Sequence, residues 1–144
     1  MFTGRKTIEI HPSLELLGTA LLSCPHLNEL DLSDNAVSVE GARALTAYLS
    51  TGTSLTVLRL NNTGVGSTGG TLVGQALLAA SKRGLRLQTF ALGRSRLEIP
   101  GAKAIGKALG AMGSLEEILL PQNGIRPAGI AFIAGLCSMC VSFS

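Results

Sequence analysis

The stretch Leu55-Thr-Val-Leu58-Arg-Leu60-Asn-Asn-Thr-Gly-Val65 decides the fold of this chain. With Leu55 counted as position 0, its apolar residues occupy positions 0, 3, 5 and 10. This spacing is typical of the strand and turn of a leucine-rich repeat. The same pattern begins again at Leu27, Leu87 and Leu115, so the four starts are 28, 32 and 28 residues apart. The sequence therefore predicts a solenoid in which each repeat contributes one strand.

A second, independent periodicity lies between the strand patterns. Apolar residues three, four or seven apart form one face of a helix. Such stripes occur five times: Leu14, Leu17 and Leu21; Ala42, Leu45 and Leu49; Val73, Ala76 and Leu77; Ala102, Ile105 and Leu109; Ile130, Ile133 and Cys137. The fold class is accordingly α/β, a leucine-rich repeat solenoid of about 28-residue strand–helix repeats. We expect a crescent like that of ribonuclease inhibitor.

The repeats define the expected domain organisation. Residues 1–137 form a leucine-rich repeat domain, made of a partial first repeat and four further repeats, and residues 138–144 form a non-repeat tail. The middle step is four residues longer than the others, and Ser81-Lys-Arg-Gly84 is expected to absorb them as a loop.

Composition excludes several functional classes. Hydrophobic residues make up 46% of the 144 residues and aromatic residues only 3%, and the net charge is +3. A small, scattered charge without interleaved aromatics argues against nucleic acid as a partner. The apolar stretch from Pro127 to Ser144 is interrupted and short for a membrane span. Three cysteines and no signal peptide predict a cytoplasmic protein.

Two adjacent positions of the repeat are candidates for polar roles. Position 8 is expected to turn inward and bond the loop backbone, and it holds Asn35, Thr63, Ser95 and Asn123. Position 7 points to solvent, and it holds Asp34, Asn62, Arg94 and Gln122. These four differ in charge and shape, so they form either a solvated rim or a set of partner contacts. Asn62 is expected to offer a free amide, since Thr63 already fills the inward position.

The residues between the apolar strand positions are expected to line the concave face. That face is mixed, with acidic groups at both ends and Arg59 between them. It is either a protein-binding surface or an ordinary solvated sheet. Its residues are Asn28, Glu29, Asp31, Thr56, Val57, Arg59, Gln88, Thr89, Ala91, Glu116, Glu117 and Leu119.

Catalytic groups are not apparent. His11 and His26 lack acidic or cysteine partners nearby in the sequence. The single CxxC of Cys137 and Cys140 favours buried structural cysteine over a metal or redox site. The glycines from Gly64 to Gly70 lack the GxxxxGK[ST] pattern of a phosphate-binding loop. We expect no metal, no cofactor and no enzymatic activity of the chain's own.

An ordered set of motifs resembles the Ran GTPase-activating protein family across about residues 2–136. The motifs are Phe2-Thr-Gly-Arg5, Leu30-Asp-Leu-Ser-Asp-Asn-Ala36, Leu60-Asn-Asn62, Gly93-Arg-Ser-Arg-Leu-Glu98 and Pro121-Gln-Asn-Gly-Ile125. The chain departs from the family's GRNRLE motif at Ser95. The family has further repeats on both sides of this segment and an acidic tail, so the resemblance implies part of a longer repeat array.

The resemblance also implies a function and a site. In that family the crescent's rim grips Ran in its GTP form and orients Ran's own glutamine, without an inserted arginine finger. The family's glutamine-fixing asparagine maps to Asn62, and the arginine of its FTGR motif maps to Arg5. Asp34, Arg94, Gln122 and Arg59 are expected as further partner contacts. The implied role is GTPase activation in nucleocytoplasmic transport, in the cytoplasm or at the nuclear envelope. The alternative is a leucine-rich repeat interaction module without activating function.

Overall fold

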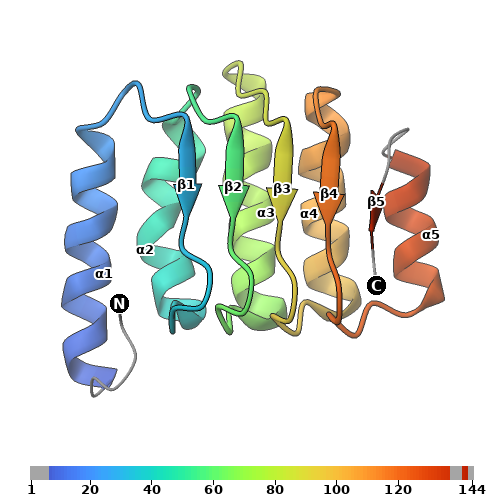
Figure 1. Cartoon of the computed structure of the whole chain (residues 1–144), viewed down its shortest axis with the longest axis horizontal. Helices are drawn as coiled ribbons and strands as arrows, with labels where there is room; N and C mark the ends of the chain where they lie inside the picture. Colours follow the sequence, from blue (N-terminus) through green and yellow to red (C-terminus); the bar gives the residue numbers. More distant parts are fainter. Residues whose placement is uncertain (1–6, 137–140, 143–144) are drawn as a thin grey trace.

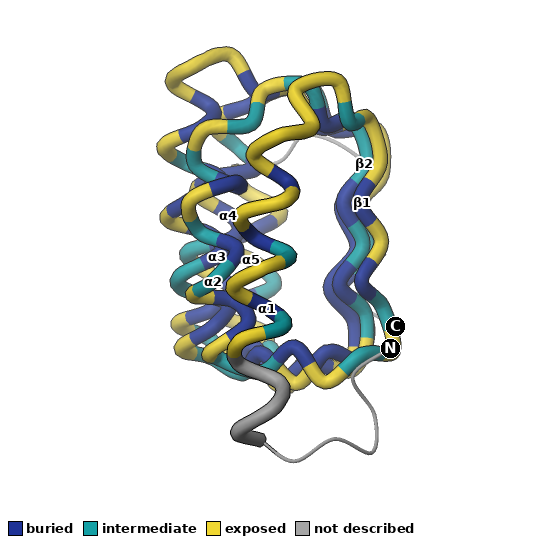
Figure 2. The backbone as a smooth tube through the Cα atoms, turned by 90° about the vertical axis from the view of Figure 1, so that its left-hand side faces the viewer, coloured by how far each residue is buried: buried dark blue, intermediate teal, exposed yellow. Residues whose placement is uncertain are grey.

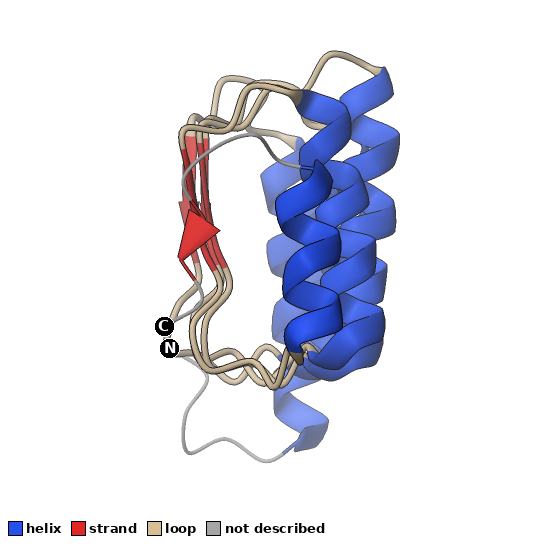
Figure 3. Ribbon diagram, turned by 90° about the vertical axis from the view of Figure 1, so that its right-hand side faces the viewer, coloured by secondary structure: helices blue, strands red, loops and turns tan. Residues whose placement is uncertain are grey.

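Two layers, one of strands and one of helices, make up the protein (Figures 1 and 3). The structure, a computed structural model, describes residues 7–136 and 141–142, with side chains from 12 to 136. The helices are α1 (Thr7–Leu22), α2 (Ser38–Thr51), α3 (Gly66–Lys82), α4 (Glu98–Met112) and α5 (Pro127–Leu136). The strands are β1 (Glu29–Asp31), β2 (Val57–Arg59), β3 (Thr89–Ala91), β4 (Glu117–Leu119) and β5 (Val141–Ser142).

All five described strands run parallel in chain order. The register follows the repeat, since Leu30 lies across from Leu58, Leu58 from Phe90, and Phe90 from Ile118. Each of these four side chains is buried, so one face of the sheet is apolar throughout. This confirms the predicted strand–helix solenoid and its strand alignment.

The core lies between the two layers, where the buried stretches of the sheet and the helices face each other (Figure 2). The stripes of α2, α3 and α4 are buried as the helical periodicity predicts. The outer helices are less covered: Leu17 on α1 and Ile130 on α5 are partly exposed. Each helix has only its neighbours to pack against, which is the usual condition of a repeat protein.

The longer middle repeat differs from the expected loop. Helix α3 continues through Lys82 and has 17 residues, against 14 in α2 and 15 in α4. Ser81 is buried in this helix, and its hydroxyl donates to the Leu78 carbonyl at 2.7 Å. The extra residues therefore lengthen the helix, and the chain reverses only at Gly84, whose φ is +109°. That backbone conformation is open to glycine and strained for other residues.

The last strand does not follow the 28-residue step. Val141 pairs with Ile118 in parallel register, which is a separation of 23 residues. A short strand thus extends the sheet within the segment that the sequence assigned to a non-repeat tail. Cys137 and Cys140 lie outside the described residues, and the division at residue 137 stays a prediction.

Glycine allows α3 and α4 to approach each other closely. A Cβ built on Gly74 would lie 2.5 Å from the carbonyl carbon of Ala104 and 2.8 Å from its side chain. These are backbone contacts that a rotamer change cannot relieve. The distance between these two helices is therefore set by the hydrogen atom of Gly74.

Gly74→Ala is expected to destabilise the protein by about 1–3 kcal/mol, the usual cost of overpacking a close contact. The change would otherwise favour the helix by up to about 1 kcal/mol. Gly135→Ala in α5 is the matched control, because nothing lies within 4 Å of its Cβ position. Urea denaturation of both variants measures the difference, and equal stabilities would contradict the close packing.

Candidate functional site

The loops that follow β1 to β4 form a continuous rim at the carboxyl end of the parallel strands (Figure 1). Their backbones are hydrogen-bonded from one repeat to the next. The Asp34 amide donates to the Asn61 carbonyl at 2.9 Å, the Asn62 amide to Gly93 at 2.8 Å, and the Arg94 amide to Pro121 at 2.9 Å. The rim is therefore an extension of the sheet's hydrogen bonding, and it holds the loops in fixed relative positions.

Position 8 turns inward, as the sequence predicts. Thr63, Ser95 and Asn123 are buried, and Asn35 is partly buried. Asn123 donates to the Leu92 carbonyl and accepts the Ser95 amide at 2.9 Å. These side chains satisfy loop backbone groups that are shielded from water.

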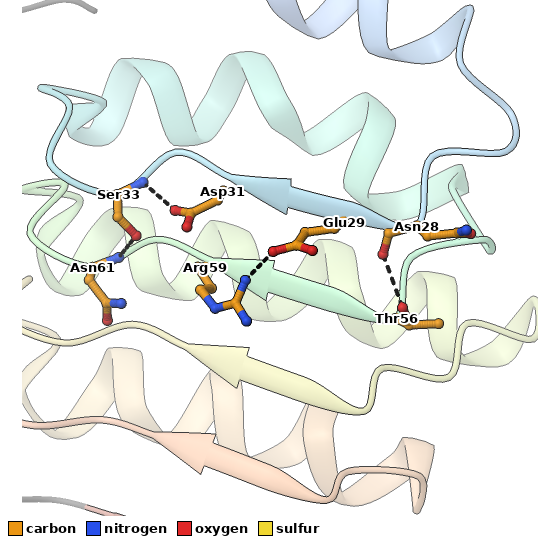
Figure 4. Close-up of polar contacts among 7 residues, drawn as sticks. All are labelled: Asn28, Glu29, Asp31, Ser33, Thr56, Arg59 and Asn61. Atoms are coloured by element: carbon orange, nitrogen blue, oxygen red, sulfur yellow. Dashed lines mark hydrogen bonds and ion pairs between the residues drawn. The ribbon is translucent and has the colours of Figure 1, made fainter.

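Position 6 braces the loops, a role that the sequence analysis missed. The Ser33 hydroxyl accepts the Asn61 amide at 3.1 Å (Figure 4), and Asn61 Oδ1 accepts the Gly93 amide at 2.7 Å. A Cβ on Gly93 would approach Pro121 Cγ to 2.8 Å and Asn61 Oδ1 to 3.1 Å. Polar residues at one slot in residues 28 apart were the available signal, since such residues become neighbours in the solenoid.

The four residues at position 7, which we call the rim row, share an unusual backbone conformation. Their φ angles are +59°, +54°, +49° and +52°, and all four side chains are exposed. The left-handed conformation costs most residues about 1–2 kcal/mol, and asparagine and aspartate less. Every repeat thus turns its position 7 side chain out of the rim. The rim row consists of Asp34, Asn62, Arg94 and Gln122.

Asn62 is exposed, but its amide nitrogen is engaged. Nδ2 donates to Asp34 Oδ1 at 3.0 Å, across one repeat. The expectation of an entirely free amide is therefore wrong for the nitrogen. Among residues 12–136, no protein group is hydrogen-bonded to the Asn62 Oδ1. The oxygen is the part of this side chain that a partner could use.

The other predicted site residues fall into two groups. Arg94 and Gln122 extend the rim row beyond Asn62, and within residues 12–136 no hydrogen bond or ion pair engages either side chain. Arg5 lies outside the described residues, so its predicted role stays a prediction. The structure brings Asp34, Asn62, Arg94 and Gln122 together in one row.

Arg59 lies on the concave face of the sheet and not on the rim. It forms an ion pair with Glu29 on the neighbouring strand (Figure 4). Both side chains are partly exposed, so the pair contributes about 0–1 kcal/mol to stability. The face is exposed or half-exposed, as predicted, except at Ala91, which is buried. The larger Arg59 and Leu119 flank Ala91 in the same row across the sheet.

The described residues offer no apparent catalytic centre. Residues described with side chains hold no cluster of three or more histidine, cysteine or acidic groups suited to a metal ion. Burial raises the pKa of the Tyr48 hydroxyl, and the nearby Cys24 thiol raises it further. Tyr48 lies towards the end of α2, away from the rim, and its hydroxyl would stay protonated at neutral pH. In the described part of the chain, no helix is long and apolar enough to cross a membrane.

Comparisons with known proteins agree with this architecture. Residues 23–45 match the family model described as Leucine Rich repeat. The chain is 44% identical over 135 residues to Ran GTPase-activating protein 1 of Xenopus laevis, covering 88% of the chain and 23% of that protein. It is 45% identical to Ran GTPase-activating protein 2 of Caenorhabditis elegans, covering 90% and 14%. Its identity to Ran GTPase-activating protein 1 of Saccharomyces cerevisiae is 38%, covering 91% and 34%.

The fold and the repeat match define the chain as a leucine-rich repeat protein of the α/β class. Within that class it corresponds to a segment of the Ran GTPase-activating proteins, which confirms the resemblance noted in its motifs. The chain spans between 14% and 34% of the length of these curated relatives.

The contrast between neighbouring loop positions is testable. Asn123→Ala would leave the Leu92 carbonyl and the Ser95 amide without their partners. Each such buried group costs about 1–3 kcal/mol, so we expect a loss of about 2–4 kcal/mol in unfolding free energy. Gln122→Ala changes the adjacent, exposed residue and should stay within about 0.5 kcal/mol. Chemical denaturation compares the two, and a similar loss in both would contradict the inward and outward assignment.

Proposed function

We propose that this chain stimulates GTP hydrolysis by a Ran-type small GTPase in its GTP form, using the rim row as its contact surface. The observation that carries the proposal is Asn62, an exposed amide whose oxygen is unengaged among the described residues, on a loop held by backbone bonds to both neighbouring repeats. The relatives' printed names supply the reaction and the partner.

The chemistry asks for position more than for reactive groups. Phosphoryl transfer is catalysed mainly by orienting the nucleophile and stabilising charge, with little covalent participation by the protein. In the proposed mechanism Asn62 hydrogen-bonds to the partner's catalytic glutamine and thereby fixes the side chain that orients the attacking water. A neutral amide is suited to holding another amide, because each offers one donor and one acceptor side.

The remaining contacts are proposed from placement along the rim. Arg94 and Gln122 continue the rim row next to Asn62, and both side chains are exposed. Arg59 on the concave face is a weaker candidate, because Glu29 already pairs with it. Arg5 is proposed from the family motif alone. The chain would use no cofactor of its own, and the hydrolytic chemistry would belong to the partner.

Other parts of the expectation stay proposals as well. A cytoplasmic location and a role in nucleocytoplasmic transport accompany the Ran partner and rest on the resemblance. Absence of nucleic acid among the partners rests on the small net charge of +3.

The second candidate is an interaction module that binds a protein without activating it. The concave face favours it, because acidic groups flank Arg59 there and half-exposed apolar side chains such as Leu119 accompany them. Loss of binding on changing Arg59, without any stimulation of hydrolysis by the unchanged chain, would support this candidate over the first.

The main prediction concerns the Asn62 amide. Asn62→Gly removes it and keeps a residue that accepts the φ of +54°, so the rim backbone should persist. We expect the saturating rate of hydrolysis to fall about 100-fold, as when one positioned hydrogen-bonding group is removed from a transition state. Single-turnover GTP hydrolysis by Ran, with and without the chain, measures this rate.

Asn28→Ala is the matched control, because it removes an exposed amide at the opposite end of β1 (Figure 4). It should leave the stimulated rate unchanged. Equal rates for the parent and Asn62→Gly, with both chains folded, would overturn the proposed role of Asn62.

A further inference from the structure

The rim contains one side-chain hydrogen bond between exposed residues of neighbouring repeats at position 7. Asn62 Nδ2 lies 3.0 Å from Asp34 Oδ1. Both residues have left-handed backbones, and both backbone amides are bonded to the next loop. The two side chains are therefore held next to each other by the repeat and do not meet by chance motion of loops.

The chemistry of the pair has a direction. A carboxylate can only accept hydrogen bonds, whereas the two ends of an asparagine amide differ, one donating and one accepting. Rotation of the amide by half a turn would place Oδ1 against the carboxylate, oxygen facing oxygen. Asp34 thus selects the orientation in which the NH₂ group faces along the rim and Oδ1 faces away from Asp34.

The other neighbour of Asn62 in the rim row agrees with this orientation. Arg94 lies on the far side, one repeat further along, and a guanidinium has only donors. It cannot accept the Asn62 NH₂ group, so it does not compete with Asp34 for it. The charge order along the rim, acidic then amide then basic, gives the amide a single preferred direction.

We propose that Asp34 is a positioning residue that fixes the Asn62 amide as a hydrogen-bond acceptor towards the partner. The group that fits the exposed Oδ1 is an N–H donor, and the NH₂ of a primary amide is the match for a glutamine. The glutamine's own oxygen then stays available to accept a hydrogen bond from water. The kinetic consequence rests on the proposed function, whereas the orientation of Asn62 does not.

This role differs from a direct partner contact by Asp34, and kinetics separate the two. Removing a contact weakens binding and raises the concentration of chain needed for half-maximal stimulation. Removing a positioning residue lowers the saturating rate and leaves that concentration nearly unchanged. Asp34→Gly removes the carboxylate and tolerates the φ of +59°.

The first experiment reads the orientation without any partner. In ¹⁵N-labelled protein, the two NH₂ proton resonances of Asn62 should differ in chemical shift, because only one proton faces a carboxylate. Asp34→Gly should reduce that difference, and Glu15→Gln, an equal loss of charge on α1, should leave it unchanged. An unchanged Asn62 signal in Asp34→Gly would overturn the proposal.

The second experiment is a double-mutant cycle in single-turnover hydrolysis by Ran. We expect Asp34→Gly to lower the saturating rate about tenfold, since the amide loses its fixed direction. Asp34→Asn should recover part of that loss, because its oxygen can still accept the Asn62 NH₂ group. In the Asn62→Gly background, Asp34→Gly should have no further effect, because the two residues act through one amide.

Two results would overturn the kinetic part. One is an Asp34→Gly effect confined to the half-saturating concentration, and the other is a loss that multiplies fully with that of Asn62→Gly. If the parent chain gives no stimulation, the proposed function fails and the kinetic part fails with it. The resonance experiment then decides the Asp34–Asn62 orientation by itself.

Discussion

The hydrogen-bond ladder between successive repeats is the constraint on which the rest of the structure depends. Strands β1 to β4 pair in register, and the ladder continues past their ends into the loops, where each position 7 amide donates to the next repeat. In a solenoid each repeat contacts only its neighbours, so this ladder and the packed helices carry the stability. It also converts a spacing of 28 or 32 residues in the sequence into direct adjacency in space.

Adjacency along the rim explains why a strained backbone persists there. Arg94 and Gln122 have left-handed φ angles that their side chains do not favour. The loop bonds on both sides over-determine the conformation, which is the condition under which such strain survives. The result is a row of outward side chains whose spacing is set by the sheet, with far less freedom than side chains on an isolated loop.

The sequence predicted the parts of the structure that periodicity controls. The strand register, the buried stripes of α2 to α4 and the inward polar residues follow from it directly, because burial repeats with the chain. It did not predict contacts between repeats. Helix α3 took up the extra residues since Ala80 and Ser81 are buried in continuation of its stripe. Ala91 is buried because its row neighbours are larger, and Asp34 engages the Asn62 amide that was expected to be free.

Asparagine at position 62 meets two separate demands, and few residues meet both. The rim backbone needs a residue that accepts a left-handed φ, which favours glycine, asparagine and aspartate. The proposed site needs a neutral group with a donor on one side and an acceptor on the other, which favours a primary amide. Glycine fails the second demand, glutamine is less suited to the first, and aspartate next to Asp34 would place two carboxylates together. The same ladder that builds the fold thus narrows the choice of residue at the point where we propose that the partner is held.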